Sequence, residues 1–552
     1  MRIVAGLFVL ASLGAYARPA HACGGFFCSS APVDQAGETI VYSHEADGTL
    51  TMSVEVSYQG MDRSFAWILP VIAPPTEIGI ASPALFDQLE AATRPIFVTE
   101  EETVGDCHAT PTCVDPYTGY GGGSGGGCGA SSSPGGWSGG YVDASSSATE
   151  PPIVADSGSG PGPGVTVFSS DTIGPYDTVV LGAASATEVV TWLRDHDYDI
   201  PEASTDLLEP YAAAGQVFVA LRLSANQPTG TLRPIRLHIP TDEACLPIRL
   251  TPIASVPRLP IRAFFLGSEP VAPQNYATAV VDVATPDYWT GRATFQTDVD
   301  AAIDDLGGQA FHVDYAGRTP AVPIALPAVA DLAGETDPAA LLQALRDRGY
   351  AADPLIPELL GRFMTPPADS LPASYYNCLI NSDTAFCGEP IVFDPAGLVE
   401  AVQNEITFPR QADQDLIRRH GYLTRLYTSL SVGKMTLDPV FVPEPRVPDT
   451  SAVHTAVEVT ECNAAIYESD AARHWEIDGA TYRIRSQGPA ADDSAYCRAR
   501  GLVLESEAPP PTASSSSSGG CLCGVAGGSQ ISFGFLLGFA LMIIFRRARD
   551  KR

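Results

Sequence analysis

The chain has 552 residues, of which 45% are hydrophobic, and its 64 acidic and 32 basic side chains give a formal net charge of −32. This length allows two or three domains with a large core. The acidic balance excludes nucleic acid and bare anionic membrane as expected partners, because both are bound through cationic surfaces.

The first 22 residues have the pattern of a secretory signal peptide. Arg2 precedes an apolar core over residues 3–13, and Ala20-His21-Ala22 forms an A-x-A cleavage site before Cys23. We therefore expect cleavage between Ala22 and Cys23. A lipoprotein is the alternative, since cleavage exposes Cys23, but Ala20 stands where a lipobox usually has leucine.

Strand patterns dominate the next stretch. Three β-rich runs at residues 38–44, 50–58 and 63–69, separated by turn residues, predict a β-meander. Ser82-Pro83 predicts the start of a helix through Ala92, with serine as N-cap and proline in the first turn. Residues 96–104 predict a further strand.

Several short motifs resemble a bacterial protein family. They are Cys-Gly-Gly-Phe-Phe-Cys at 23–28, Ala-Trp-Ile-Leu-Pro at 66–70, Ser-Pro-x-Leu-Phe-x-x-Leu at 82–89, the runs at 192–201 and 207–211, and residues 423–441. Together they resemble the bacterial domain-of-unknown-function family number 2330 over residues 23–447. That family has no assigned activity, so the resemblance implies no functional residues.

Residues 116–164 interrupt the resemblance with glycine, serine and proline. This segment has too little apolar surface to fold, and we expect a disordered insertion. Residues 122–126 match G-x-S-x-G in form. A nucleophile elbow needs a strand before the serine and a helix after it, and neither is predicted here.

Mixed elements follow the insertion. The patterns predict helices over 187–196 and 204–213, and strands at 165–169, 178–181, 216–223, 231–239, 245–250 and 261–266.

A short pattern is repeated. Residues 193–198 (Leu-Arg-Asp-His-Asp-Tyr) recur as 345–350, each is followed by a Leu-Leu-x-x-aromatic motif, and residues 417–422 are a shorter echo. The offsets of 152 and 72 residues are too unequal for a solenoid. We interpret the repeat as a helix–turn–helix packing unit with leucine and tyrosine in the core and arginine solvated. A repeated binding site is the alternative.

The composition changes again after Pro443. Strand patterns at 452–460, 475–477 and 481–484 predict a small β appendage over 448–504, closed by Cys462 and Cys497. The Pro- and Ser-rich residues 505–520 predict a linker that holds the body away from a membrane.

Twelve cysteines in an exported chain favour disulfides over metal ligands. The local pairs are Cys23 with Cys28, Cys378 with Cys387, and Cys462 with Cys497. Cys107, Cys113, Cys128 and Cys245 would then pair among themselves, in an order that the sequence leaves open. A zinc site of Cys107, His108, Cys113 and Cys128 is the alternative, but none of these spacings is C-x-x-C.

The C-terminal residues 521–552 read as a sorting tail. Cys521 and Cys523 precede 22 uncharged residues, about 33 Å as a helix, followed by a basic cluster expected on the cytoplasmic side. This order resembles the MYXO-CTERM-type tail of myxobacterial surface proteins. The resemblance implies cleavage near Cys521 or Cys523 by an intramembrane sorting protease of the rhombosortase-like or CPBP type, lipid attachment and surface display. A permanent membrane anchor in the periplasm is the alternative.

One acidic pattern suggests calcium. Asp195, Asp197, Asp199 and Asp206 are spaced like the first, third, fifth and twelfth residues of a calcium loop. Ile200 replaces the glycine of the sharp turn, which favours a solvated acidic helix end. The nine histidines include no H-E-x-x-H, and we predict no catalytic residue and no cofactor other than this calcium alternative.

These patterns predict an α+β ectodomain with a β-rich core, helical hairpins and disulfides, between a signal peptide and a C-terminal transmembrane tail. Without the two ends, which carry charges of +2 and +4, the ectodomain has a net charge of −38. The predicted function is a structural or adhesion-type interaction protein of the cell envelope, with its ligand left open. The alternatives are an envelope hydrolase acting on peptide or glycan, and a calcium-dependent binding protein.

Overall fold

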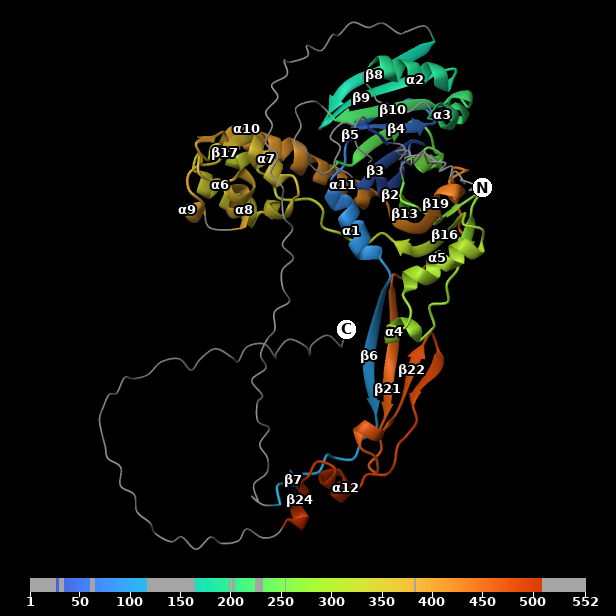
Figure 1. Cartoon of the computed structure of the whole chain (residues 1–552), viewed down its shortest axis with the longest axis vertical. Coiled ribbons are helices and arrows are strands. Elements are labelled where there is room, and N and C mark those ends of the chain that lie inside the picture. Colours follow the sequence, from blue (N-terminus) through green and yellow to red (C-terminus); the bar gives the residue numbers. More distant parts are fainter. Residues whose placement is uncertain are drawn as a thin grey trace, which may run out of the picture. The chain divides into compact units, whose positions relative to one another are not determined.

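The computed structural model describes residues 26–28, 34–59, 65–116, 164–196, 198, 200, 204–223, 232–253, 255–381 and 384–508 (Figure 1). The signal peptide, most of the insertion and the sorting tail predicted above lie outside these residues. The chain divides into two compact units. Unit 1 takes its described residues from 26–107, 164–463 and 468–488, and unit 2 from 108–116, 464–467 and 489–508.

Two β-sheets form the centre of unit 1. The larger has the order β15-β16-β19-β13-β2-β3-β11-β5, and the smaller has the order β1-β4-β10-β9-β8. The larger sheet contains β2 (Asp34–His44), β3 (Leu50–Gln59), β5 (Glu77–Ile80), β11 (Ile235–Ile239), β13 (Arg258–Gly267), β15 (Ala277–Ala279), β16 (Ala310–Arg318) and β19 (Tyr422–Ser431). The smaller contains β1 (Phe26–Cys28), β4 (Phe65–Val71), β8 (Val165–Ile173), β9 (Tyr176–Ala183) and β10 (Val217–Leu223).

The two sheets pack face to face, and helices cover their outer faces. Successive side chains of a strand point to opposite faces, so Val219 of β10 packs in the core between the sheets whereas Phe218 packs against helices. Those helices are α2 (Ala186–Asp195) and α3 (Ser204–Ala213). On the larger sheet, the outer layer includes α1 (Pro83–Thr93) and α11 (Phe408–Arg419). The predicted α+β class with a β-rich core is confirmed.

The predicted β-meander is wrong in its third strand. β2 and β3 form the expected hairpin, but β3 pairs on its other side with β11. β4 crosses to the smaller sheet and pairs with β10 and β1. Trp67 and Leu69 face the other sheet and Ile68 faces the helices, so β4 is buried on both sides. Such a strand fits either sheet, and its alternation pattern alone does not choose between them.

Smaller elements complete this part of unit 1. A three-stranded sheet has the order β12 (Ala244–Cys245), β20 (Val440–Pro443) and β14 (Val271–Pro273). The strand predicted over 245–250 therefore ends at Cys245. Two helices, α4 (Asp287–Thr290) and α5 (Phe295–Asp305), follow β15, and α5 packs against β15, β16 and β19.

The chain between β16 and α11 forms a helical group with its own core (Figure 1). It contains α6 (Pro338–Asp347), α7 (Ile356–Phe363), α8 (Pro372–Asn381), α9 (Thr384–Cys387) and α10 (Pro395–Val402), with an antiparallel pair of β17 (Met364–Thr365) and β18 (Val392–Phe393). A π-helical turn over Gln403–Thr407 joins α10 to α11.

The repeated pattern is a packing unit, as predicted. Leu193 and Tyr198 are buried beside α3, and the matching Leu345 and Tyr350 are buried beside α7. Arg194 is not simply solvated, because its Nε and Nη2 atoms donate to the Ile200 carbonyl at 3.0 and 2.8 Å. The echo at 417–422 joins α11 to β19 and forms no helix pair.

A four-stranded sheet of unit 1 unites distant segments. Its order is β23 (Ala480–Arg485), β22 (Ala472–Ile477), β21 (Val453–Glu461) and β6 (Ile96–Val104). β6 runs parallel to β21 over nine residue pairs. The appendage predicted over 448–504 is therefore not self-contained, because it includes a strand from the N-terminal part of the chain.

Unit 2 is small. It contains α12 (Asp493–Arg498) and the two-stranded pair of β7 (Cys113–Val114) and β24 (Val503–Leu504). Asp492 caps α12 by accepting a hydrogen bond from the Ala495 backbone N–H at 2.9 Å. Within the described part of the chain, no helix is both long and apolar enough to cross a membrane.

Candidate functional site

Two long-range disulfides link the C-terminal part of the described chain to residues far earlier in the sequence. Cys107 pairs with Cys462 in unit 1 and Cys113 pairs with Cys497 in unit 2, with Cα atoms 4.5 and 5.5 Å apart. The partners are 355 and 384 residues apart in sequence. The third disulfide, Cys378 to Cys387, is the local pair that the sequence predicts.

The predicted pairing of Cys462 with Cys497 is wrong, and the strand register explains why. Val104 at the end of β6 pairs with Glu461 at the end of β21. The Cys462 N–H then donates to the Val104 carbonyl at 2.8 Å, which holds Cys462 close to Cys107. Parallel pairing of β6 and β21 therefore selects this partner, and Cys497 bonds to Cys113.

The other cysteine predictions are resolved in part. Cys245 is unpaired among the described residues. Burial, and to a smaller extent the nearby carboxylates of Asp438 and Glu243, raises the pKa of its thiol to about 12. This thiol stays protonated and unreactive at neutral pH. The Cys23–Cys28 pair and Cys128 depend on residues or side chains outside those described. The zinc alternative loses Cys107 and Cys113, because both are in disulfides.

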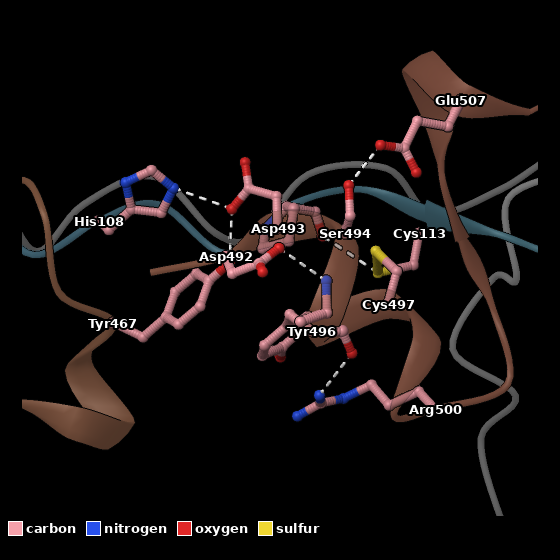
Figure 2. Close-up of a disulfide and its surroundings, with 12 residues drawn as sticks. His108, Cys113, Tyr467, Asp492, Asp493, Ser494, Tyr496, Cys497, Arg500 and Glu507 are labelled. Carbon is pink, nitrogen blue, oxygen red and sulfur yellow. Dashed lines mark hydrogen bonds and ion pairs between the residues drawn. A yellow bond between two sulfur atoms is a disulfide. The ribbon is translucent and has the colours of Figure 1, made fainter. Parts of the chain in front are cut away.

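Unit 2 gathers polar side chains next to its disulfide (Figure 2). Figure 2 shows His108 and Tyr467 converging on Asp493 in the first turn of α12. His108 Nε2 lies 2.9 Å from Asp493 Oδ1, and the Tyr467 hydroxyl donates to the same oxygen. The other ring nitrogen of His108, Nδ1, lies 2.9 Å from the Ala464 carbonyl oxygen.

The two hydrogen bonds of His108 favour its charged form. Both ring nitrogens face acceptors, so only the imidazolium donates to both. The Ala464 carbonyl and then Asp493 raise the pKa of His108. Tyr467 and then His108 lower the pKa of Asp493, while burial and the bond to Asp493 raise the pKa of Tyr467 to about 12. The cluster is thus an ion pair at mildly acidic pH.

Further contacts fix α12. The Arg500 guanidinium lies 3.5 Å from the centroid of the Tyr496 ring, and Arg500 Nη1 donates to the Tyr496 carbonyl at 3.0 Å. The Ser494 hydroxyl donates to the Glu507 carboxylate. Glu507 is next to the last described residue, so the segment leading to the predicted tail is bonded to α12 (Figure 2).

A serine–histidine pair in unit 1 has the composition of a hydrolase site without its geometry. Ser43 Oγ lies 2.6 Å from His420 Nε2. Glu45 Oε1 lies 3.0 Å from Ser43 Oγ and 3.8 Å from the same Nε2. In a catalytic triad the acid contacts the other ring nitrogen and orients the base. Ser43 is also fully buried, so this cluster forms a polar network under α11 and offers no exposed nucleophile.

A hollow of about 220 Å³ lies beside the π-helical turn and is lined by Ile80, Gly174, Arg233, Asn404, Glu405 and Pro409. Turns of this kind are frequent at functional sites. The Arg233 guanidinium is 5% exposed and contacts Glu405 at 2.6 Å and Glu358 at 3.1 Å. Both carboxylates also contact Arg362. The two guanidinium groups and the two carboxylates therefore neutralise one another within the protein.

The structure places two aspartates of the predicted calcium pattern on different helices. Asp195 ends α2 and Asp206 lies in the first turn of α3, while Asp197 and Asp199 lie outside the described residues. Among the described residues, no group of three or more His, Cys, Asp or Glu side chains is arranged to hold a metal ion.

The His108 cluster was missed in the sequence because its members are far apart. His108 follows Cys107, while Asp493 precedes Cys497 by four positions. Both positions flank disulfide cysteines. The correct cysteine pairing would have brought them together, but the sequence favoured a different one.

Comparison with known proteins supplies the family. Residues 18–363 match a family model described as an uncharacterized protein conserved in bacteria (DUF2330). The chain belongs to this family. The expected resemblance is confirmed over the two-sheet core up to α7, whereas residues 423–441 lie beyond the matched segment. No curated protein and no solved structure matches the chain.

Proposed function

We propose that this member of the DUF2330 family is an exported structural or interaction protein of the cell envelope, held at the membrane through its C-terminal tail. The observation that carries the proposal is the disulfide between Cys113 and Cys497, which lies just before the tail. Disulfides form and persist outside the reducing cytosol, and this chain has three among its described residues.

The position of this disulfide suits an anchored protein. A force acting through the tail reaches unit 2 at its last residues. The β7–β24 pair, with two residues in each strand, offers little resistance to peeling. Such a force would peel β24 first, but at Cys497 the disulfide passes it directly to Cys113, so that the chain before Cys497 is shielded from it.

The sequence supports the same role. The signal-peptide pattern at residues 1–22 provides for export, and the tail pattern at 521–552 provides for anchoring. On this proposal, the tail is processed near Cys521 or Cys523, and the acidic ectodomain is displayed at the outer surface.

Cell fractionation of the full chain and of a chain lacking residues 521–552 tests this proposal. We expect the full chain in the membrane fraction, digested when protease is added to intact cells, and the truncated chain released in soluble form. Thiol alkylation without reduction should leave Cys113 and Cys497 unmodified in both. A cytosolic full chain with alkylated Cys113 and Cys497, or a truncated chain that stays in the membrane, would contradict the proposal.

A further inference from the structure

Strand β6 forms an open edge of the four-stranded sheet in unit 1. It is the last strand in the order β23-β22-β21-β6, and Figure 1 shows it outside β21. Every residue from Val98 to Val104, seven of the nine in the strand, is exposed. A nine-residue edge of this kind is long enough to pair with another extended chain.

The register shows which backbone groups face outward. The Ile96 N–H donates to the Ala452 carbonyl, and the Val104 carbonyl accepts from the Cys462 N–H. Because strand residues alternate in the side to which their backbone groups point, the even-numbered residues from Ile96 to Val104 bond to β21. Phe97, Thr99, Glu101 and Thr103 therefore present their N–H and C=O groups to the open edge.

Aromatic side chains of α4 pack over one face of the sheet at the start of β6. The rings of Tyr288 and Trp289 from α4 lie 5.0 Å from the ring of Phe97, and Trp289 Nε1 donates to the Val98 carbonyl at 3.1 Å. The stretch from Thr99 to Thr103 continues beyond these contacts. Among the described residues, its outward N–H and C=O groups have no hydrogen-bond partner.

The charges along the edge are of one sign. Glu100, Glu101 and Glu102 lie at its centre and are exposed. Glu461 and Glu476 share the face of Glu100 and Glu102, but both already contact the ring nitrogens of His474, at 3.3 and 3.5 Å. The attraction for a cationic partner therefore rests on the three glutamates of β6 itself. Negative charges deter two copies of β6 from pairing, because like charges would then lie opposite one another. The same charges attract a cationic strand.

We propose that β6 is a docking edge for an extended basic peptide segment of another protein, which adds a strand next to Thr99–Thr103. Main-chain hydrogen bonds would give affinity, and Lys or Arg side chains beside Glu100 and Glu102, which share one face of the sheet, would give selectivity. This inference names a partner class for the interaction role proposed above and rests on it.

Binding of the full chain, purified in detergent, to the labelled peptide TKVKTKVKT tests the edge. Two control peptides accompany it: TEVETEVET, and TKVKTKVKT with every backbone nitrogen methylated. Losing two or more backbone hydrogen bonds, at about 0.5–1.5 kcal/mol each, predicts about tenfold or greater weakening for the methylated peptide. The Glu peptide should bind at least as weakly, because it lacks the attractive charges.

Variants of the protein separate strand pairing from charge. Thr99→Pro removes an outward N–H without breaking a bond to β21 and should weaken binding about tenfold, whereas Thr99→Val should not. Replacing Glu100, Glu101 and Glu102 by Gln should weaken binding at low salt and remove most of its salt dependence. Unchanged melting temperatures would show that the variants are folded.

The proposal is overturned if the methylated or the Glu peptide binds as well as TKVKTKVKT, or if Thr99→Pro and Thr99→Val bind alike. That failure would leave the anchoring proposal intact, because membrane fractionation is measured without any peptide. Conversely, a cytosolic location would overturn the anchoring proposal, even if the edge binds the peptide in vitro.

Discussion

The two-sheet core and the disulfide-bonded end of the chain are stabilised in different ways. The core buries apolar side chains from both sheets and keeps its one described unpaired cysteine, Cys245, partly buried. The four-stranded sheet has a core cluster of only three buried residues, Ala456, Trp475 and Ile477. The long-range disulfides lie in this thinner part and in unit 2. Burial holds the fold where an interior exists, and covalent links hold it where the interior is too small.

The largest loss of stability is expected from a substitution in the core. Phe265 is 1% exposed, with its ring centroid 5.2 Å from that of Tyr42 and 4.7 Å from that of Phe441. Phe265→Ala should lower the free energy of unfolding by about 3–5 kcal/mol because it leaves a cavity. The control Phe168→Ala removes a ring that is 49% exposed and should cost far less. Equal shifts of the two urea midpoints would contradict this picture of the core.

Removal of the unit 2 disulfide tests the other region. The double variant Cys113→Ser with Cys497→Ser should destabilise unit 2 by about 2–4 kcal/mol. Hydrogen exchange should then accelerate in α12 and β24 but not in β10 or β13. The control, Cys378→Ser with Cys387→Ser, opens a link of sequence separation 9 and should affect only the helical group. Faster exchange in the two-sheet core of the first variant would mean that the regions are not independently stabilised.

Core and end should also differ in their dependence on pH. Burial raises the pKa of Glu38 from 4.5 to about 7, against the hydrogen bond from Gln35. A raised acid pKa gives stability that is present below pH 4.5 and lost as the pH rises through about 7, roughly 3 kcal/mol in total. Glu38→Gln should reduce the slope of the free energy of unfolding in this range, while Glu55, whose pKa burial also raises to about 7, keeps part of it.

Glu444 provides the matched control. Arg446 lowers the pKa of this partly exposed carboxyl to about 2, so its contribution changes only below its unfolded value of 4.5. Glu444→Gln should therefore leave the slope between pH 4.5 and 7 unchanged. If Glu38→Gln behaved in the same way, the buried carboxyl would not be a source of pH dependence.

The smallest effect is expected in unit 2. The pKa of His108 is raised, so its contribution to stability is complete below the ordinary value of 6.5 and is lost as the pH rises through the folded value. After correction for intrinsic exchange rates, α12 amides should be better protected at pH 6 than at pH 8. His108→Gln should abolish that difference and His44→Gln in unit 1 should not. Equal pH dependence in both variants would remove His108 as its source.

Local sequence signals predicted where helices and strands begin and end better than they predicted which strands pair. Ser82 caps α1 as expected, and the ends of α3 and β6 agree with the predicted ones, because caps and alternation are encoded by neighbouring residues. The sheet to which β4 belongs depends on contacts with β10, which is distant in sequence.

The same distinction applies to the site. Cys378 and Cys387 were predicted as a pair because they are close in sequence, whereas Cys107 and Cys113 meet partners more than 350 residues away. Parallel pairing of β6 with β21 brings Cys107 to Cys462. No local pattern in either strand specifies that these two strands pair. The open edge of β6 likewise follows from sheet order and not from its sequence.

The most direct test of the central claim is mass spectrometry of the protein isolated from the membranes of its own host, digested without reduction. We expect a peptide pair linked by Cys113 and Cys497, and a C-terminal peptide that ends near Cys521 or Cys523 with an added acyl mass. A C-terminal peptide that runs unmodified to Arg552 would contradict processing and lipidation of the tail. Recovery of free Cys113 and Cys497 would contradict the disulfide-locked, exported protein proposed here.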